Sequence, residues 1–252
     1  MSDSGAPPPK KQGGVSFTHE TLEKLPILVA PSTKGEKNTI RMELIPVACW
    51  RVNDVRFAFS SSFLLPDVAD EFRTLATLCQ AHPGAPLSIF GHADPVGDDN
   101  FNKVLSGRRA ESVYAVLTRD ADRWEKLRST AAANHDEWGP ESITTMEQAT
   151  GVSSGGTADG RKKLYLAYMD FLCRDAAGAP FRVDKTGFLG KGADAGGKAD
   201  FQGCGEFNPV LVFSKAENAE FSKAENKAQR DEENGKNRRV VLYLFRPGVT
   251  VP

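Results

Sequence analysis

The sequence has 252 residues, with 32 Lys and Arg against 33 Asp and Glu and a formal net charge of −1 at pH 7. A hydrophobic content of 40% suffices for a real core and excludes global disorder, while the balanced charge argues against nucleic-acid binding by bulk electrostatics. The longest apolar runs stop well short of the about 20 residues that a membrane helix needs, so no transmembrane helix is expected.

Residues 1–16 are rich in Pro, Gly, Ser and Lys and are predicted to be a disordered tail. No apolar segment follows the first lysines, so no secretory signal peptide is visible. The cysteines lack CxxC spacing, which argues against a zinc ribbon or a thioredoxin-type site. Cys49 and Cys79 are expected to be core residues, and Cys173 and Cys204 are the pair to test for a disulfide.

Residues 39–59 mix β-branched and aromatic residues in near alternation, which predicts a hairpin with its turn at Asn53 and Asp54. Pro46 lies within the first of the two runs. Because proline cannot donate to a sheet ladder, Pro46 indicates an edge strand or a bulge.

Helices and strands then alternate. Residues 66–80 carry apolar side chains at helical spacing and predict an amphipathic helix, and residues 86–91 predict a short buried strand. A second helix is predicted to begin at Ser106. The apolar run at residues 238–245 predicts a final strand inside a sheet.

Residues 118–202 interrupt this order and are predicted to form a mainly helical inserted subdomain. Its main helix is predicted over residues 162–173, between glycine-rich loops. Residues 213–228 contain the tandem repeat FSKAEN, too short for a solenoid. This repeat indicates an exposed helical arm or a mobile loop, with a dedicated binding element as the alternative.

A polar cluster follows the strand at residues 86–91: first Asp94, then Arg108 and Arg109, which are expected in the first turn of the next helix. This pattern places Asp94 and the arginines around one crevice of an α/β sheet. A carboxylate beside a guanidinium can receive a zwitterion, because arginine grips a carboxylate and aspartate accepts an ammonium. The alternative is a structural salt bridge that fixes the loop.

Several motifs in this order resemble the OmpA-like C-terminal domain family, whose members bind peptidoglycan without covalent attachment. The resemblance covers about residues 54–117 and 203–246 and implies a β/α/β/α/β-β two-layer sandwich, an α/β (α+β) fold. The motifs are VRFAFSSSFLLP, LSIFGHADPVG, FNKVLSGRRAESV, GCGEFNP and NRRVVLYL.

The resemblance also implies site residues. Asp94 would meet the ammonium of diaminopimelate in the stem peptide, Arg109 would meet its carboxylate, and Asn102 and Leu105 would lie in the segment that closes over the peptide. Arg238 or Arg239 would be structural. The sequence departs from the family pattern at Ser60, often Asp, and at Ala93, often Thr, which puts peripheral hydrogen bonds in doubt.

The implied function is a non-catalytic peptidoglycan-binding module that anchors a protein or assembly to the cell wall, in the cell envelope or periplasm. It needs no cofactor. Because no signal peptide is visible, the export route stays open, with cytoplasmic synthesis and non-classical export as one option. The alternative is an adaptor in an envelope or contractile secretion assembly that docks onto protein. The expected division of the chain is a tail at 1–16, a β extension at 17–53, an OmpA-like domain at 54–117 and 203–252, and an insertion at 118–202.

Other chemistries have weaker signals. His92 with its neighbouring aspartates lacks the spacing of a metal site, and Ser60 to Ser62 lack a nucleophile elbow. A murein hydrolase with its active site in the insertion is disfavoured because no acid pair or metal set appears there. Trp50, Trp124 and Trp138 are expected in the core or at its rim, with a sugar platform as the alternative.

Overall fold

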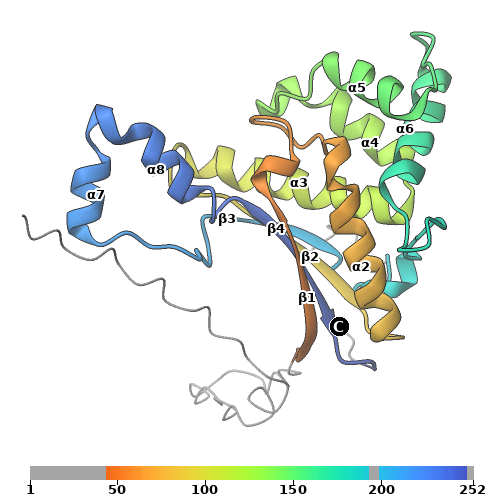
Figure 1. Cartoon of the computed structure of the whole chain (residues 1–252), viewed down its shortest axis with the longest axis horizontal. Helices are drawn as coiled ribbons and strands as arrows, with labels where there is room; N and C mark the ends of the chain where they lie inside the picture. The colour runs from red at the N-terminus through yellow and green to blue at the C-terminus, as the bar shows by residue number, and fades with distance from the viewer. Residues whose placement is uncertain (1–43, 193–198, 249–252) are drawn as a thin grey trace, which may run out of the picture. The chain divides into compact units, whose positions relative to one another are not determined.

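A computed structural model of the chain describes residues 44–192 and 199–248 (Figure 1). Its helices and four-stranded mixed sheet form the α+β two-layer sandwich that the sequence predicts. The predicted tail and most of the predicted N-terminal extension lie outside the described residues. Among the residues that the structure describes, no helix combines the length and the apolar character that a membrane span requires.

The sheet consists of β1 (Pro46–Asn53), β2 (Leu87–His92), β3 (Phe201–Gly205) and β4 (Arg239–Phe245). The strands lie in the order β1-β4-β2-β3. β4 is antiparallel to both neighbours, and β2 is parallel to β3. The final strand is therefore interior, as its continuous apolar sequence predicts.

The predicted hairpin over residues 39–59 is wrong. β1 pairs with β4, and the residues after β1 turn through the short 3-10 helix Asp54–Arg56. An alternating pattern fits any antiparallel partner, and this partner lies at the other end of the chain, where local sequence cannot indicate it. Pro46 does lie on an edge strand beside a register shift, as predicted.

The α-helices are α2 (Ala69–Ala81), α3 (Asp99–Thr118), α4 (Ala121–Ser129), α5 (Glu141–Thr150), α6 (Ala158–Leu172), α7 (Lys215–Phe221) and α8 (Lys227–Asn234). α3 packs on β2 and β3, and α2 packs on β1, so these two helices form the second layer (Figure 1). α2 confirms the predicted amphipathic helix, since Phe72 and Leu75 on its inner face are fully buried.

The insertion packs against the sandwich. α4 lies on α3, and α6 contacts α2, α3 and α4. Trp124, Trp138 and Tyr168 surround Phe63 with ring centroids 5.5 to 6.3 Å away. Because these rings belong to the same buried cluster as the sheet, the insertion and the sandwich share one core. Trp50 is also buried, so all three tryptophans are core residues rather than sugar platforms.

The tandem repeat forms an exposed helical arm, one of the two structures that the sequence analysis left open, and the arm comprises α7 and α8, residues 215–234. α7 begins with a capping box between Ser214 and Glu217, and none of its residues is buried. In Figure 1, α7 lies away from the sheet, and α8 returns the chain to the start of β4. The arm therefore ends at buried Asn234, next to the sandwich.

The cysteines are all free thiols, so Cys173 and Cys204 form no disulfide in this structure. Burial raises the pKa of the Cys173 thiol. Cys49 is exposed rather than a core residue. Alternate residues of a strand face opposite sides of the sheet. In β1, Trp50 and Val52 face the core, so Cys49 lies on the exposed side of the strand.

Candidate functional site

The loop between β2 and α3 carries Asp94. α3 begins with Asp98 as its N-cap, so the prediction that this helix begins at Ser106 is wrong. The first turns of α3 are largely polar, and the apolar stripe on which the prediction relied starts later. Arg108 and Arg109 therefore lie in the middle of α3 rather than in its first turn.

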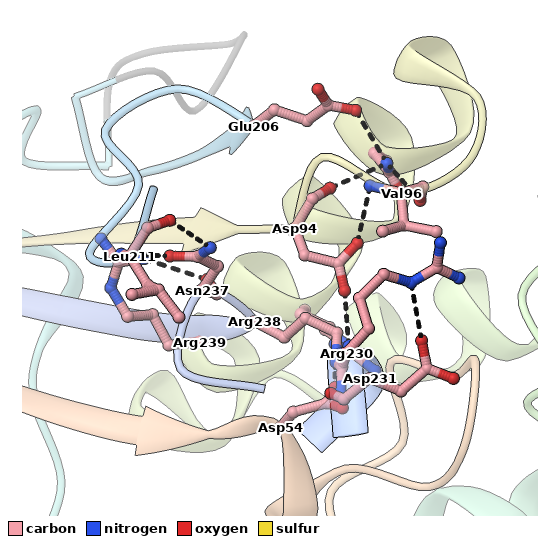
Figure 2. Close-up of polar contacts among 12 residues, drawn as sticks. Asp54, Asp94, Val96, Glu206, Leu211, Arg230, Asp231, Asn237, Arg238 and Arg239 are labelled. Atoms are coloured by element: carbon pink, nitrogen blue, oxygen red, sulfur yellow. Dashed lines mark hydrogen bonds and ion pairs between the residues drawn. The ribbon is translucent and has the colours of Figure 1, made fainter. Parts of the chain in front are cut away.

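Asp94 is nearly buried and bonded on both oxygens. Its Oδ1 accepts a hydrogen bond from the Val96 backbone N–H at 2.9 Å, and its Oδ2 pairs with Arg238 Nη1 at 2.5 Å (Figure 2). The side chain is 9% exposed. The turn after β2 thus directs the carboxylate toward the residue that precedes β4.

Arg238 links three segments of the chain. Besides Asp94, its Nε pairs with Asp54 Oδ2 at 2.7 Å, and its Nη2 donates to the Asp231 carbonyl of α8 at 3.0 Å. Burial opposes the charged form, but the hydrogen bonds that Arg238 donates to Asp94 and Asp54 outweigh it and raise the pKa of Arg238. Arg238 is therefore a firmly charged bridge between two carboxylates.

Arg109 lies below the surface. Its Nε donates to the Ser61 carbonyl at 2.9 Å, its Nη1 pairs with Asp54 Oδ1 at 2.5 Å, and its guanidinium lies over the Phe57 ring. The side chain is 7% exposed. Burial lowers the pKa of Arg109, and Asp54 partly offsets that effect.

These contacts form one charge network, in the order Arg109, Asp54, Arg238, Asp94. The sequence analysis expects Asp94 and Arg109 to present free charged ends to a ligand. The structure instead joins them through Asp54 and Arg238 and pairs each within the chain. A ligand at this site must therefore compete with internal partners, and the binding roles of Asp94 and Arg109 remain predictions.

Asn102 holds the loop in place. Its Nδ2 lies 3.1 Å from the carbonyl oxygens of Asp94 and Val96 and 3.0 Å from Glu206 Oε1, after β3. Leu105, one turn later on α3, is 8% exposed and packs inward. The structure therefore gives Asn102 a positioning role, and contact with a peptide remains a prediction for both residues.

Sequence reasoning missed Asp54, which it interpreted as a turn residue, and it expected only a structural place for Arg238. The β1–β4 register sets Asn53 opposite Arg239, and the Asp54 N–H donates to the Arg238 carbonyl at 3.1 Å. The pairing of two strands far apart in sequence brings these charges together. No local motif signals that pairing.

A second buried cluster ties the insertion to the sandwich. Arg108 Nε pairs with Asp136 Oδ2 at 2.7 Å, and the Asp136 carboxylate also accepts hydrogen bonds from the hydroxyls of Ser61 and Ser62. The two side chains of the ion pair are 9% and 0% exposed. Both serines are fully buried and their hydroxyls bind Asp136, so a nucleophilic role has no support there.

His92, at the end of β2, is buried and its Nδ1 lies 3.0 Å from the Phe207 carbonyl oxygen. Burial lowers its pKa from the usual value, and the Phe207 hydrogen bond only partly opposes this shift. Within the described residues, no group of three or more His, Cys, Asp or Glu side chains is arranged to hold a metal ion.

The stability of the protein should therefore fall as the pH drops below about 6.5, the usual pKa of histidine. A histidine with a lowered pKa in the folded state is protonated first in the unfolded chain, so acid favours unfolding, by up to about 1.4 kcal/mol per pH unit. Urea unfolding at pH 7 and pH 5 should show this loss in wild type and in His82→Gln, and a smaller loss in His92→Gln. An unchanged pH slope in His92→Gln would contradict this assignment.

No family model matches the chain. A stretch of 67 residues, 27% of the chain, is 36% identical to outer membrane porin F of Pseudomonas fluorescens, and a stretch of the same length is 34% identical to outer membrane porin F of Pseudomonas aeruginosa. The chain spans about a fifth of the length of these relatives, 21% and 19%. The similarity supports the OmpA-like resemblance over that stretch and a relationship to outer membrane proteins.

Another similarity, 26% identity over 104 residues, is to a photosystem I chlorophyll a apoprotein of Gloeobacter violaceus. It covers 40% of this chain and 12% of that protein.

Proposed function

We propose that this chain is a non-catalytic peptidoglycan-binding module that attaches a protein or an assembly to the cell wall through diaminopimelate of the stem peptide. The observation that carries the proposal is the position of Asp94. It lies in the loop between β2 and α3 and belongs to a charge network with Arg238, the residue that precedes β4. The OmpA-like motifs and the partial similarity to porin F support it.

Diaminopimelate presents an ammonium and a carboxylate on one short side chain. In the proposed complex Asp94 faces the ammonium, because each carboxylate oxygen can accept a further hydrogen bond beside its bond to Val96 or Arg238. Asp54 and Arg238 have side chains 25% and 28% exposed, against 9% for Asp94, so in the proposed complex the ligand approaches Asp94 from the side of the network where these two residues meet solvent. The binding energy then comes from a few charge-assisted hydrogen bonds.

We expect wild-type protein to sediment with purified sacculi, and Asp94→Asn to weaken this binding about 10 to 150-fold, equivalent to about 1.5–3 kcal/mol for one charge-assisted contact. Asp70→Asn is the matched control, because Asp70 lies on the outer face of α2 with a side chain 77% exposed. Circular dichroism would verify that each variant is folded. If wild type stays in the supernatant, the proposal is wrong.

The second candidate function is an adaptor that docks onto protein. The specific observation is an exposed apolar segment between β3 and the arm: Phe207, Val210 and Val212 are 74%, 57% and 75% exposed. Exposed apolar side chains in succession are typical of protein contacts. A Phe207→Ala, Val212→Ser variant that keeps sacculus binding but no longer associates with the other envelope components would favour this function.

A further inference from the structure

The sheet has a second face, opposite the one on which α2 and α3 pack, and this face carries a cavity. Gly91 faces α3, because a Cβ atom there would meet Ser106, so its neighbours Phe90 and His92 point to the opposite side. The cavity on that side has a volume of about 400 Å³. Its lining includes Phe90, His92, Cys204, Arg239, Tyr243 and Phe245.

The cavity has a charged end and an apolar end. At one end, Arg239 of β4 lies opposite His92 of β2 in the strand register. At the other end, the centroid of the Tyr243 ring lies 5.7 Å from that of Phe90 and 6.2 Å from that of Phe245. Arg239 and Phe245 are the first and last residues of β4 and are separated by about 20 Å along the strand. The cavity therefore suits a long, narrow ligand with one polar end.

Arg239 has no carboxylate partner among residues 44–192 and 199–248. It is 7% exposed, and its Nη1 and Nη2 donate to the carbonyl oxygens of Asn237 and Asn208, each at 2.9 Å. A guanidinium carries more N–H donors than these bonds use. Because buried charges in proteins are normally paired, Arg239 is available to pair with an anion that a ligand supplies.

The charges around Arg239 are positive or neutral. Arg51 lies on the same face of the sheet, donates to the Lys236 carbonyl oxygen at 2.8 Å, and likewise has no carboxylate partner in the described parts of the chain. Burial lowers the pKa of Arg239, and the nearby Arg51 charge lowers it further. His92 is neutral at pH 7, because burial lowers its pKa. This end of the cavity therefore favours an anion.

The backbone of the sheet selects the rest of the ligand. β4 is an interior strand, so its backbone N–H and C=O groups bond to β1 and β2. A peptide lying on this face would bury its own amides without partners, which costs free energy. An acyl chain has no polar groups, and each CH₂ that it removes from water favours binding. The face of the sheet thus favours an acyl chain over a peptide.

We propose that this cavity binds a single-chain fatty acid, with its carboxylate paired to Arg239 and its acyl chain on the rings of Phe90, Tyr243 and Phe245. The carboxylate supplies the negative charge that the buried guanidinium lacks. The inference goes beyond the proposed function and does not depend on it, because these residues take no part in the charge network around Asp94.

The test is calorimetric titration of the full chain with laurate below its micellar concentration. Wild type should bind laurate, and Arg239→Gln should bind it about 10 to 150-fold more weakly, as for one charge-assisted contact. Lauryl alcohol, which has the chain without the charge, should bind wild type and Arg239→Gln equally weakly. Arg73→Gln removes an exposed charge from α2, in the other layer, and should bind laurate like wild type.

Phe90→Ala tests the apolar end and keeps both hydrogen bonds of Arg239, and it should bind laurate several-fold more weakly than wild type. Phe59→Ala is its matched control, because it removes a ring that is 88% exposed outside the cavity, and it should bind like wild type. Circular dichroism would verify that each variant is folded. Should Arg239→Gln not fold, the comparison of laurate with lauryl alcohol on wild type decides.

Three results would overturn the inference: no binding of laurate to wild type, equal binding of laurate and lauryl alcohol, or equal binding of laurate to wild type and folded Arg239→Gln. An apolar peptide with a free C-terminal carboxylate that binds more tightly than laurate would also overturn it. If wild type binds laurate but does not sediment with sacculi, the proposed function fails and this inference stands.

Discussion

Replacing Asp136 with alanine should lower the free energy of unfolding by about 3–5 kcal/mol, the usual cost of removing one partner from a buried ion pair. Asp136 is 0% exposed in its side chain and pairs with Arg108 Nε at 2.7 Å. It also accepts hydrogen bonds from both Ser61 and Ser62. The substitution leaves the Arg108 charge buried and several donors unsatisfied at once.

The matched control is Asp70→Ala, which breaks an ion pair with Arg73 whose side chains are 49% and 77% exposed. Exposed pairs contribute about 0–1 kcal/mol, so this variant should unfold close to wild type in urea. A loss below about 1 kcal/mol in Asp136→Ala would show that the insertion is not anchored through this pair. The result also concerns the site, because the Ser61 carbonyl accepts from Arg109.

Gly91→Ala should also be strongly destabilising, by about 1–3 kcal/mol or more, as expected for an overpacked contact. A Cβ atom at Gly91 in β2 would lie 1.9 Å from the Ser106 carbonyl oxygen of α3, far inside any real contact. Since the atom it meets is backbone, α3 as a whole would have to move away from the sheet. That shift would separate Asn102 from the Asp94 loop.

Gly107→Ala is the matched control in the same interface. Its added Cβ would meet the Gly203 backbone at 3.5 Å, an ordinary van der Waals distance. Alanine is the better helix former by about 0.8–1.0 kcal/mol, so this variant should be as stable as wild type or more stable. Equal urea midpoints for Gly91→Ala and Gly107→Ala would contradict the close packing of α3 on β2.

Local patterns predicted much of the fold. The spacing of apolar residues in α2, the continuous apolar run of β4 and the charged repeat of the arm each predicted an element that the structure contains. These features follow from periodicity and composition, which are properties of a short window of sequence. The motifs likewise placed Asp94 in the loop after β2 and Arg109 on α3.

Long-range pairing decided the rest. The sequence by itself determined the α+β class, the elements and the presence of Asp94 and Arg109, because these depend on neighbours along the chain. Only the tertiary structure decided that β1 pairs with β4, which sets Asp54 beside Arg238 and buries Arg109 against Asp54. The partner of a charged side chain depends on which strands and helices are neighbours in the fold. Short-range periodicity does not predict which distant strands pair.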